Sequence, residues 1–441
     1  MSIKNEFKDT DKDRFFYGWI ILAGCFFATM SYGLFYTFGV FFKSLQVEFG
    51  WSRALTSSVT SLHLIVNALS GIMIGRITDR YGPRMALTIG AFLIGTGLML
   101  CSQIENIWHL YIFYGLIASL GAGVVYSLPT ATVQRWFIEK RGLVLGITMS
   151  GVGFGTMIFS PIANYLISSY GWRVAYIVFG SVSLFVLTSF ALTMVYGPEK
   201  IGLRPYGFHK NKKEHPLQTA NPTNNKANLI SGEETQTWTT REVIQTRAFW
   251  LVYLLHLFSV LPLFMIMVHI VPFATDIGIP KEIAASALGF IGGVSILGRI
   301  AMGSLSDRIG WKYSLIICVG LCGIMTFSLI YVRSVWALFV FVVLFGFFYG
   351  GKVSVFPGLV GSFFGNNSLA EIIGVLSTCL GISGMIGPIA GGYIYDRMGS
   401  YTLAFLLAFA SYFIAFLFSI IVTPPQKCYK HNCEDHISAI K

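Results

Sequence analysis

The chain has 441 residues, of which 54% are hydrophobic, 15% are aromatic and only 12% are charged. Soluble globular proteins carry about 25% charged residues, so this composition excludes a soluble enzyme, a nucleic-acid-binding protein and a disordered chain. The formal net charge is +11, and a membrane protein is expected to place such an excess of Lys and Arg in its cytoplasmic loops. Long unbroken apolar runs, rather than short alternating segments, predict membrane-spanning helices and not a barrel.

Twelve apolar runs follow one another along the chain, and each is long enough to cross a hydrocarbon core of about 30 Å. The first six form an N-terminal bundle over 16–196, with runs at 16–43, 54–75, 85–103, 107–134, 143–170 and 173–196. The second six form a C-terminal bundle over 248–423, with runs at 248–275, 283–306, 313–332, 335–364, 370–395 and 400–423. The rest is polar: a tail at 1–15, a linker at 197–247 and a tail at 424–441.

The distribution of positive charge predicts how the chain crosses the membrane. With both termini in the cytoplasm, 23 of the 31 Lys and Arg residues lie on the cytoplasmic side, six lie on the other side and two lie inside helices. This bias follows the positive-inside rule and predicts cytoplasmic tails and a cytoplasmic linker. No cleavage site follows the first run, which is expected to act as a signal anchor. We expect a multi-pass plasma membrane protein, of a kind compatible with a bacterial inner membrane.

The two halves of the chain repeat each other at a constant offset of 228 residues. The repeated pairs are the loops Gly75–Arg84 and Gly303–Lys312, then Pro129 and Pro357, then Gly171 and Gly399. A single offset that holds in three places predicts two homologous six-helix halves. The expected fold class is therefore an all-α membrane protein of twelve helices in two pseudo-symmetric bundles.

The loop Gly75–Arg84 (GRITDRYGPR) resembles the best-known loop motif of the major facilitator superfamily. In that family the Asp of this loop lies near the N-terminus of a helix from the opposite half, where the helix dipole favours a carboxylate. The resemblance implies a latch that holds the halves together when the cytoplasmic side is closed. Its expected residues are Asp79, Arg80, Asp307 and Arg308.

Pairs of glycines four residues apart occur on four of the predicted helices. The pairs are Gly71/Gly75, Gly151/Gly155, Gly289/Gly293 and Gly387/Gly391, on the second, fifth, eighth and eleventh helices. This spacing lets two helices approach closely. Because these four helices form the contacts between the halves in the family that the chain resembles, we expect the glycines to lie there.

A second resemblance narrows the branch. The segments Phe49–Ala54 (FGWSRA), Arg135–Leu143 (RWFIEKRGL) and Gly171–Tyr176 (GWRVAY) are similar to the oxalate/formate antiporter and monocarboxylate transporter branch of the superfamily. This resemblance covers nearly the whole chain except the tails and the linker. It implies transport of small carboxylates, by proton symport or by anion exchange.

Two cations lie within predicted helices, whereas all 20 carboxylates lie in tails, in loops or near helix ends. Arg299 precedes Asp307 by eight residues, or about 12 Å of helix, which places it near the middle of the membrane. Lys352 is at a similar depth on the tenth helix. A charge at this depth is unfavourable by at least about 2.5–3.5 kcal/mol and marks a functional site. Without an acidic partner in any crossing, both cations are expected to bind a substrate anion, Arg299 through its bidentate fork and Lys352 as a point charge.

The branch resemblance supports Arg299, because the eighth helix of oxalate and monocarboxylate carriers bears a substrate-binding Arg. It also implies that Tyr36 and Tyr126 enclose the substrate, although tyrosines have many other roles in packing and at membrane interfaces. Two positions depart from the family pattern. Leu380 stands where the oxalate exchanger has its second cation, and Ser295 stands where animal monocarboxylate carriers have an Asp one turn before the Arg.

Proton coupling has few candidate groups. His63, His256 and His269 titrate near neutrality, although a single His in a helix is more often simply hydrogen-bonded. Alternatively, Lys352 could release its proton from the empty site, because burial and the nearby Arg299 disfavour its charged form. Substrate anion and proton would then bind together.

These observations predict a secondary active transporter of small monocarboxylates such as lactate, pyruvate or formate, working by alternating access with proton symport. An anion exchanger and a carrier of the same fold for another solute are the alternatives. We expect no enzymatic activity, no cofactor and no metal, since the sequence contains no P-loop motif and no metal-ligand cluster. The expected partners are the carboxylate, a proton and the lipid bilayer, without nucleic acid, and the functional unit is expected to be a monomer.

Overall fold

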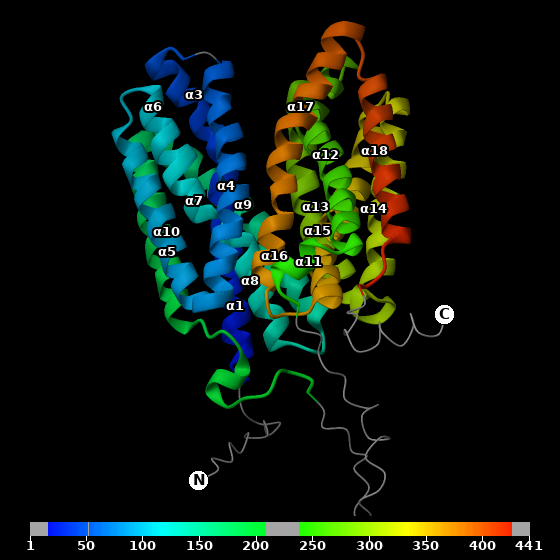
Figure 1. Cartoon of the computed structure of the whole chain (residues 1–441). Coiled ribbons are helices and arrows are strands. Elements are labelled where there is room, and N and C mark those ends of the chain that lie inside the picture. The colour runs from blue at the N-terminus through cyan, green and yellow to red at the C-terminus, as the bar shows by residue number, and fades with distance from the viewer. Residues whose placement is uncertain (1–15, 52, 209–237, 426–441) are drawn as a thin grey trace, which may run out of the picture.

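The computed structural model describes residues 16–51, 53–208 and 238–425. Within these ranges twelve segments are long and apolar enough to span a membrane, which confirms the predicted all-α fold. The segments form two bundles that stand side by side (Figure 1), and each bundle has its own buried core. The predicted N-terminal tail, most of the C-terminal tail, the centre of the linker and Ser52 lie outside the described residues.

The N-terminal bundle contains the first six crossings. In chain order its helices are α1 (Gly18–Ser31), α2 (Gly33–Tyr36) and α3 (Phe38–Phe49), then α4 (Arg53–Tyr81), then α5 (Pro83–Leu100) with η1 (Cys101–Gln103), then α6 (Ile107–Leu110), η2 (Tyr111–Ala118), α7 (Ser119–Ala122) and α8 (Val124–Trp136), then α9 (Arg141–Tyr170), then α10 (Trp172–Thr193). The linker begins with the short helix η3 (Pro198–Ile201) and ends with α11 (Thr240–Ile244).

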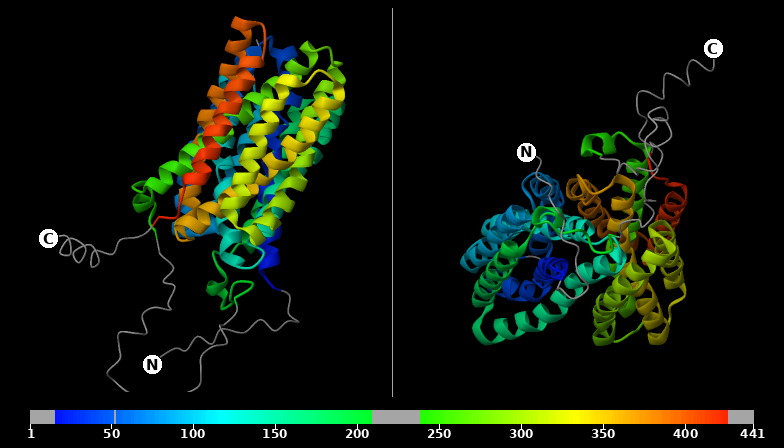
Figure 2. Two further views of the ribbon diagram at one scale, coloured as in Figure 1. Left: turned by 90° about the vertical axis from the view of Figure 1, so that its right-hand side faces the viewer. Right: turned by 90° about the horizontal axis from the view of Figure 1, so that it is seen from below.

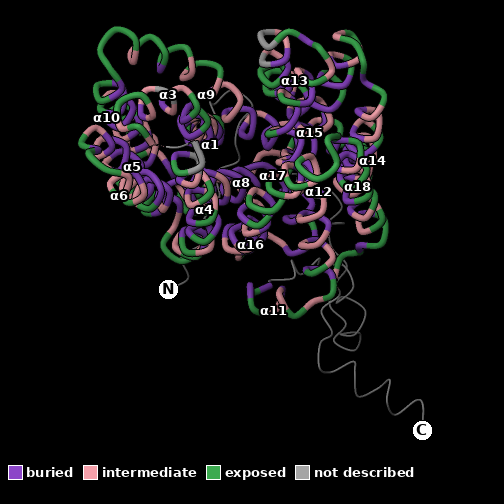
Figure 3. The backbone as a smooth tube through the Cα atoms, turned by 90° about the horizontal axis from the view of Figure 1, so that it is seen from above, coloured by how far each residue is buried: buried purple, intermediate pink, exposed green. Residues whose placement is uncertain are grey.

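The C-terminal bundle contains the other six crossings. They are α12 (Arg247–Asp276), α13 (Lys281–Ile309), α14 (Trp311–Ser328) with η4 (Leu329–Tyr331), α15 (Val335–Phe364), α16 (Leu369–Leu376) with α17 (Thr378–Met398), and α18 (Thr402–Ile421). The view from below shows the same two groups of helices packed against each other (Figure 2, right). Buried residues concentrate inside the bundles and where the bundles meet, whereas exposed residues cover the outer faces (Figure 3).

Two kinds of residue make the tight connections between helices possible. Glycines adopt backbone angles that other residues avoid, and short polar side chains accept hydrogen bonds from the unpaired amides at the start of a helix. Gly82, Gly171 and Gly310 have φ of 92°, 86° and 89°, a region that glycine enters without strain, and each directly precedes a helix. Asn106 and Ser334 cap the helices that follow them through their side chains, as short polar residues do at N-termini. Asn106 and Ser334 are also related by the 228-residue offset.

The bundles meet along two seams that the internal repeat relates to each other. In one seam Gly75 of α4 packs against Ala370 of α16, and in the other Gly303 of α13 packs against Gly142 of α9. Gly75 and Gly303 are separated by 228 residues, and so are Gly142 and Ala370. The two contacts are therefore equivalent under the internal repeat. We call the end of the molecule that carries these contacts and the two repeated loops the closed end.

The same symmetry holds one turn further along each seam. Gly71 of α4 packs against Gly374 of α16, and Arg299 of α13 packs against Gly146 of α9. A Cβ on Gly146 would overlap the backbone of Arg299, so only glycine allows α9 to approach α13 this closely. Arg299 therefore occupies, in its own half, the seam position that Gly71 occupies in the other.

The prediction that all four glycine pairs lie between the halves is wrong for three of them. Only Gly71/Gly75 lies in a seam. The pair Gly151/Gly155 packs on α1 and α2 within its own bundle, and Gly387/Gly391 packs on α12 within its own bundle. Gly289/Gly293 of α13 faces open space instead. The reason is rotation about the helix axis: Gly153 of α9 faces Ile296 across the seam, so Gly151 and Gly155, two residues to either side, face away from it.

These contacts predict that Gly142→Ala weakens closure. The new methyl group would overlap the carbonyl oxygen of Gly303, and such overpacking costs about 1–3 kcal/mol. We expect the population of the closed arrangement to fall roughly tenfold, measured as the distance between spin labels at Arg84 and Tyr313. The matched control is Gly289→Ala, whose methyl group meets no atom. A shift of equal size in both variants would contradict the assignment of this seam.

Candidate functional site

Arg299 lies midway along α13 and is buried between the bundles, with 5% of its surface exposed. Its guanidinium Nη1 donates a hydrogen bond to the carbonyl oxygen of Met149 on α9, which belongs to the opposite bundle. On its own side, the hydroxyl of Ser354 on α15 donates to the carbonyl oxygen of Arg299 at 2.9 Å. The backbone is thus fixed against α15 while the side chain points across the seam.

The guanidinium has unused hydrogen-bonding capacity. Its Nε is buried and lacks a partner among the described residues. The ion pairs that the described chain contains, Arg76–Glu371, Arg135–Asp79 and Arg173–Glu48, lie near helix ends. A buried charge is unfavourable unless an opposite charge and hydrogen bonds compensate it. The arrangement around Arg299 therefore fits an external anion with two acceptor oxygens, such as a carboxylate.

Tyrosines from both bundles gather at Arg299. Tyr36 and Tyr126, both predicted from the sequence, lie within electrostatic range of its guanidinium. Tyr36 is 56% exposed, so its ring is accessible. Tyr349 of α15 and Tyr32 join the group, since Tyr349 interacts with all three other tyrosines. Tyr32 and Tyr349 were not predicted, because nothing in the sequence distinguishes them from other aromatic residues in apolar helices.

A polar contact on the N-terminal side completes this region. Asn67 of α4 donates a hydrogen bond through Nδ2 to the hydroxyl of Tyr32 at 2.6 Å. Its repeat mate on α13 is Ser295, one turn before Arg299. The two halves therefore contribute different chemistry: the N-terminal half provides three of the tyrosines and an amide, and the C-terminal half provides the guanidinium and Tyr349.

Lys352 lies elsewhere. It is 2% exposed and donates through Nζ to the carbonyl oxygen of Ser259 on α12 at 2.7 Å. Its ammonium lies 5.8 Å from the ring centre of Tyr412 on α18. Lys352 is two residues from Ser354, a turn of about 200° around the helix, and Ser354 faces Arg299. The structure therefore directs the two predicted cations into different places, with Lys352 inside the C-terminal bundle.

Pro262 explains why α12 offers its backbone here. A proline within a helix cannot donate to the carbonyl four residues earlier, which leaves the carbonyl of Phe258 without its helical partner. The hydroxyl of Ser411 on α18 donates to that carbonyl at 2.7 Å. Lys352 bonds the next carbonyl, that of Ser259. The ammonium thus contributes to packing around Pro262.

Two of the three histidines predicted for proton coupling have hydrogen-bond partners inside their own bundles. His63 Nδ1 lies 2.6 Å from the hydroxyl of Ser119. His269 Nδ1 lies 3.2 Å from the hydroxyl of Tyr401, and its Nε2 lies 2.9 Å from the carbonyl oxygen of Pro388. These contacts are those expected of histidines that stabilise packing.

His256 differs from the other two. Its ring stacks on Phe356 at 3.9 Å, and both of its nitrogens are buried without a partner among the described residues. It also lies within electrostatic range of Lys352. The structure therefore brings together two of the four residues predicted for proton coupling, His256 and Lys352.

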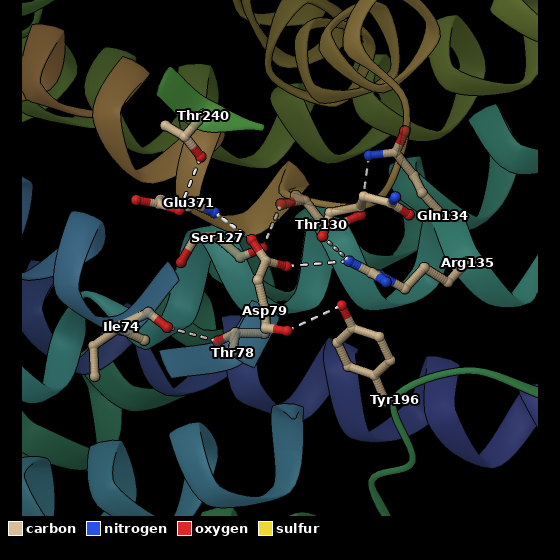
Figure 4. A network of polar contacts seen from close by, with 11 residues as sticks. Ile74, Thr78, Asp79, Ser127, Thr130, Gln134, Arg135, Tyr196, Thr240 and Glu371 are labelled. Carbon is tan, nitrogen blue, oxygen red and sulfur yellow. Dashed lines mark hydrogen bonds and ion pairs between the residues drawn. The ribbon is translucent and has the colours of Figure 1, made fainter. Parts of the chain in front are cut away.

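Asp79 lies at the centre of a polar network that links the two bundles at the closed end (Figure 4). Its Oδ2 accepts a hydrogen bond at 2.9 Å from the backbone amide of Glu371, in the first turn of α16. Its Oδ1 forms an ion pair with Arg135 at 3.1 Å. The hydroxyl of Tyr196 donates to the backbone carbonyl of Asp79 at 3.3 Å, and that of Thr240 donates to the side chain of Glu371 at 2.8 Å. A carboxylate at a helix N-terminus is in a favourable field.

Asp307 makes the repeat-related contact. Its two carboxylate oxygens accept from the backbone amides of Gly142 at 2.7 Å and Leu143 at 3.2 Å, in the first turn of α9. Leu143 and Glu371 are repeat mates, as are Asp307 and Asp79. Both carboxylates therefore bind the N-terminus of a helix from the opposite bundle.

The arginines predicted beside these carboxylates are placed differently. Arg80 and Arg308 are exposed, and the guanidinium of Arg80 lies 5.3 Å from the ring centre of Tyr81. The cations that bridge the seam are Arg135, whose Nη2 also donates to the carbonyl oxygen of Asn367, and Arg76, which pairs with Glu371 at 2.8 Å. These partners were not predicted, because a loop sequence does not show which residues of a distant loop it will meet.

Two repeated six-helix bundles, joined by paired carboxylate contacts and holding a buried cation between them, define a membrane carrier. The family model of the Major Facilitator Superfamily matches residues 21–335 and 296–431. The chain belongs to this superfamily and is a multi-pass membrane transporter.

Sequence relatives agree with the branch that the motifs indicated. Monocarboxylate transporter 12 of Homo sapiens is 29% identical over 404 residues, which cover 89% of this chain and 77% of that protein. Monocarboxylate transporter 13 of Rattus norvegicus is 23% identical over 413 residues, which cover 93% of this chain and 89% of that protein. These relatives are transporters and not enzymes.

Solved structures show the same fold. The crystal structure of the transporter FucP in the outward conformation has a TM-score of 0.70 at 14% sequence identity, and the match covers 92% of this chain and 98% of that one. A double Trp mutant of XylE has a TM-score of 0.71 at 13% identity, over 96% of this chain and 99% of that one. At this level of identity the likeness concerns the fold alone.

Proposed function

We propose that the protein transports small monocarboxylates, such as lactate or pyruvate, by alternating access with proton symport. Arg299 binds the carboxylate of the substrate, and Tyr36 and Tyr126 enclose it. The observation that carries this proposal is the buried guanidinium of Arg299 at the seam, which has an unpartnered Nε among the described residues. The names of the related transporters support the same substrate class.

Access alternates through the two seams. The structure has the bundles joined at the closed end by Asp79 and Asp307, whereas towards the opposite end α4 and α17 diverge (Figure 1). In the proposed cycle these carboxylates act as the latch, and breaking their contacts opens the closed end. The positive-inside bias places that end, both termini and the linker in the cytoplasm. A single chain contains both halves of the site, which supports a monomeric functional unit.

The test is uptake of labelled L-lactate, pyruvate, formate and oxalate into proteoliposomes, with and without an inward proton gradient. We expect gradient-driven, saturable uptake of a monocarboxylate, and counterflow against the same unlabelled anion. Uptake that requires a preloaded anion would replace symport by exchange. Failure to transport or bind any of these carboxylates would reject the proposed substrate class.

Lys352 and His256 are the proposed proton site. Replacing Lys352 with Arg keeps a cation of similar length that does not release its proton, so we expect gradient-driven uptake to be lost while counterflow of the bound anion continues. The measurement is the ratio of the two rates between pH 5.5 and 8. The control is His269→Gln, which removes a histidine with other partners. If Lys352→Arg keeps the pH dependence of the native protein, the proton is carried elsewhere.

A further inference from the structure

The internal repeat reveals a difference between the two bundles at the end opposite the closed end. In the N-terminal bundle, Glu48 at the end of α3 accepts a hydrogen bond from the indole Nε1 of Trp172 at 2.6 Å and pairs with Arg173 at 2.7 Å. The guanidinium of Arg173 lies 4.2 Å from the Trp172 ring centre. Trp172 and Arg173 together hold the pKa of Glu48 below its usual value. This carboxylate is thus paired within its own bundle.

The C-terminal bundle has the carboxylate but not the cation. Asp276 is the repeat mate of Glu48, since Gly50 and Gly278, two residues further on, both have a positive φ of 67° and 88°. One inserted residue after Gly399 shifts the offset to 229 at the start of α18. The aligned pairs there are Trp172 with Tyr401, Arg173 with Thr402, Ala175 with Ala404 and Tyr176 with Phe405. Apart from Arg173 and Thr402, every residue in these pairs is buried, which supports the alignment. Thr402 therefore stands where the other half has the guanidinium.

A hollow of about 350 Å³ lies at this position. Asp276 and Arg333 are both on its wall, and both are exposed. Arg333 is the repeat mate of Glu105, so its charge is opposite to that at the equivalent place in the N-terminal bundle. Among the described residues no ion pair joins Asp276 to Arg333. Two unlike charges thus face one hollow without neutralising each other.

The floor of the hollow is aromatic and fixed. Tyr401 stacks on Tyr395 with ring centres 4.4 Å apart, and its hydroxyl contacts His269. Burial and then the nearby Asp276 raise the pKa of Tyr401 to about 12. Phe273 and Phe405 pack edge to face beneath it at 4.9 Å. Ile277 and Ile330, both partly exposed, add apolar wall to the hollow beside the separated charges. Apolar walls with a few placed polar groups are the composition of a small-molecule site.

From this geometry we propose that the hollow binds a free α-amino acid with an apolar side chain. The ammonium group binds Asp276 and the hydroxyl of Thr402, the carboxylate binds Arg333, and the side chain packs on Ile277 and Ile330, which are partly exposed on the wall of the hollow. The ligand supplies to Asp276 the cation that Arg173 supplies to Glu48 in the other bundle. This site is separate from Arg299, which lies in the seam between the bundles.

The experiment measures binding of labelled L-leucine to the full chain in phosphatidylglycerol nanodiscs, where no lipid headgroup carries an ammonium group next to a phosphate. Saturable binding is expected in the native protein. Charge-assisted hydrogen bonds contribute enough that Asp276→Asn and Arg333→Gln should each weaken affinity about tenfold or more. Arg397→Gln is the control, because this arginine is an exposed cation at the same end that does not line the hollow.

A further variant separates this site from the transport site. Arg299→Gln should retain leucine binding if the hollow is the site. Loss of binding in Arg299→Gln, with binding kept in Arg333→Gln, would place the amino acid in the seam and overturn the proposal. Absence of saturable binding in the native protein would also overturn it. The headgroup of phosphatidylethanolamine carries an ammonium group next to a phosphate and could occupy the same hollow. The assay is therefore repeated in phosphatidylethanolamine nanodiscs, and complete loss of leucine binding there would assign the hollow to a lipid headgroup.

Discussion

Arg299→Gln is expected to abolish carboxylate uptake while leaving the fold intact. The variant has a shorter neutral side chain, which removes the charge and the fork that match a carboxylate together with the hydrogen bond from Nη1 to the carbonyl oxygen of Met149. Hydrogen bonds to charged groups contribute about 1.5–3 kcal/mol each. Loss of such bonds to the substrate should lower the specificity constant for uptake by at least about 100-fold. Initial rates of L-lactate uptake over a range of substrate concentrations measure this loss.

The comparison that makes the result specific is Arg299→Lys. Lys restores the charge but not the planar fork, so partial recovery is expected, mostly as a higher KM. Thermal unfolding of Arg299→Gln should resemble that of the native protein, because removing an unpaired buried charge is not destabilising in itself, and Arg299→Lys leaves the charge in place. If Arg299→Gln transports lactate normally, the guanidinium has only a packing role between α9 and α13.

The sequence was sufficient for the architecture because its signals are local or repeated. Apolar runs locate the helices, and the offset of 228 residues relates the halves. The same offset accounts for structural details that the runs do not show, such as the paired contacts of Asp79 and Asp307. It also shows that Arg299 is the repeat mate of Gly71, which lies in the other seam. Depth in the membrane and position in the repeat therefore both indicate that Arg299 lies between the bundles.

Rotation about a helix axis was harder to infer. Arg299 and Lys352 lie at similar depth, and depth alone predicted one shared site. The contacts of Ser354 and Lys352 show that the two faces of α15 differ by about 200°, which turns Lys352 into its own bundle. Uniformly apolar helices such as α15 carry no pattern that identifies the face towards the seam. The three misplaced glycine pairs have the same cause, and Tyr349 was missed for this reason.

The two latch carboxylates are expected to differ in strength, although the repeat makes them equivalent. Asp79 and its partner Arg135 are both largely buried, with 11% of each side chain exposed, and Asp79 also accepts from the backbone amide of Glu371. Asp307 is exposed and accepts from two backbone amides. An exposed carboxylate at a helix N-terminus contributes about 0.3–1 kcal/mol, whereas removing one partner of a buried charged pair costs more.

Asp79→Ala should therefore open the closed end much further than Asp307→Ala. We expect a shift of roughly 10- to 100-fold in the ratio of closed to open molecules for Asp79→Ala, and less than about tenfold for Asp307→Ala. Spin labels at Arg84 and Tyr313 report the ratio through the distance between the bundles. Asp79→Ala leaves Arg135 partly buried without its carboxylate, so Asp79→Ala/Arg135→Leu, which removes both charges, should recover part of the closed population. Equal shifts for the two single variants, or no recovery in the double variant, would show that the helix N-termini alone hold the bundles together and that Arg135 adds nothing to the contact.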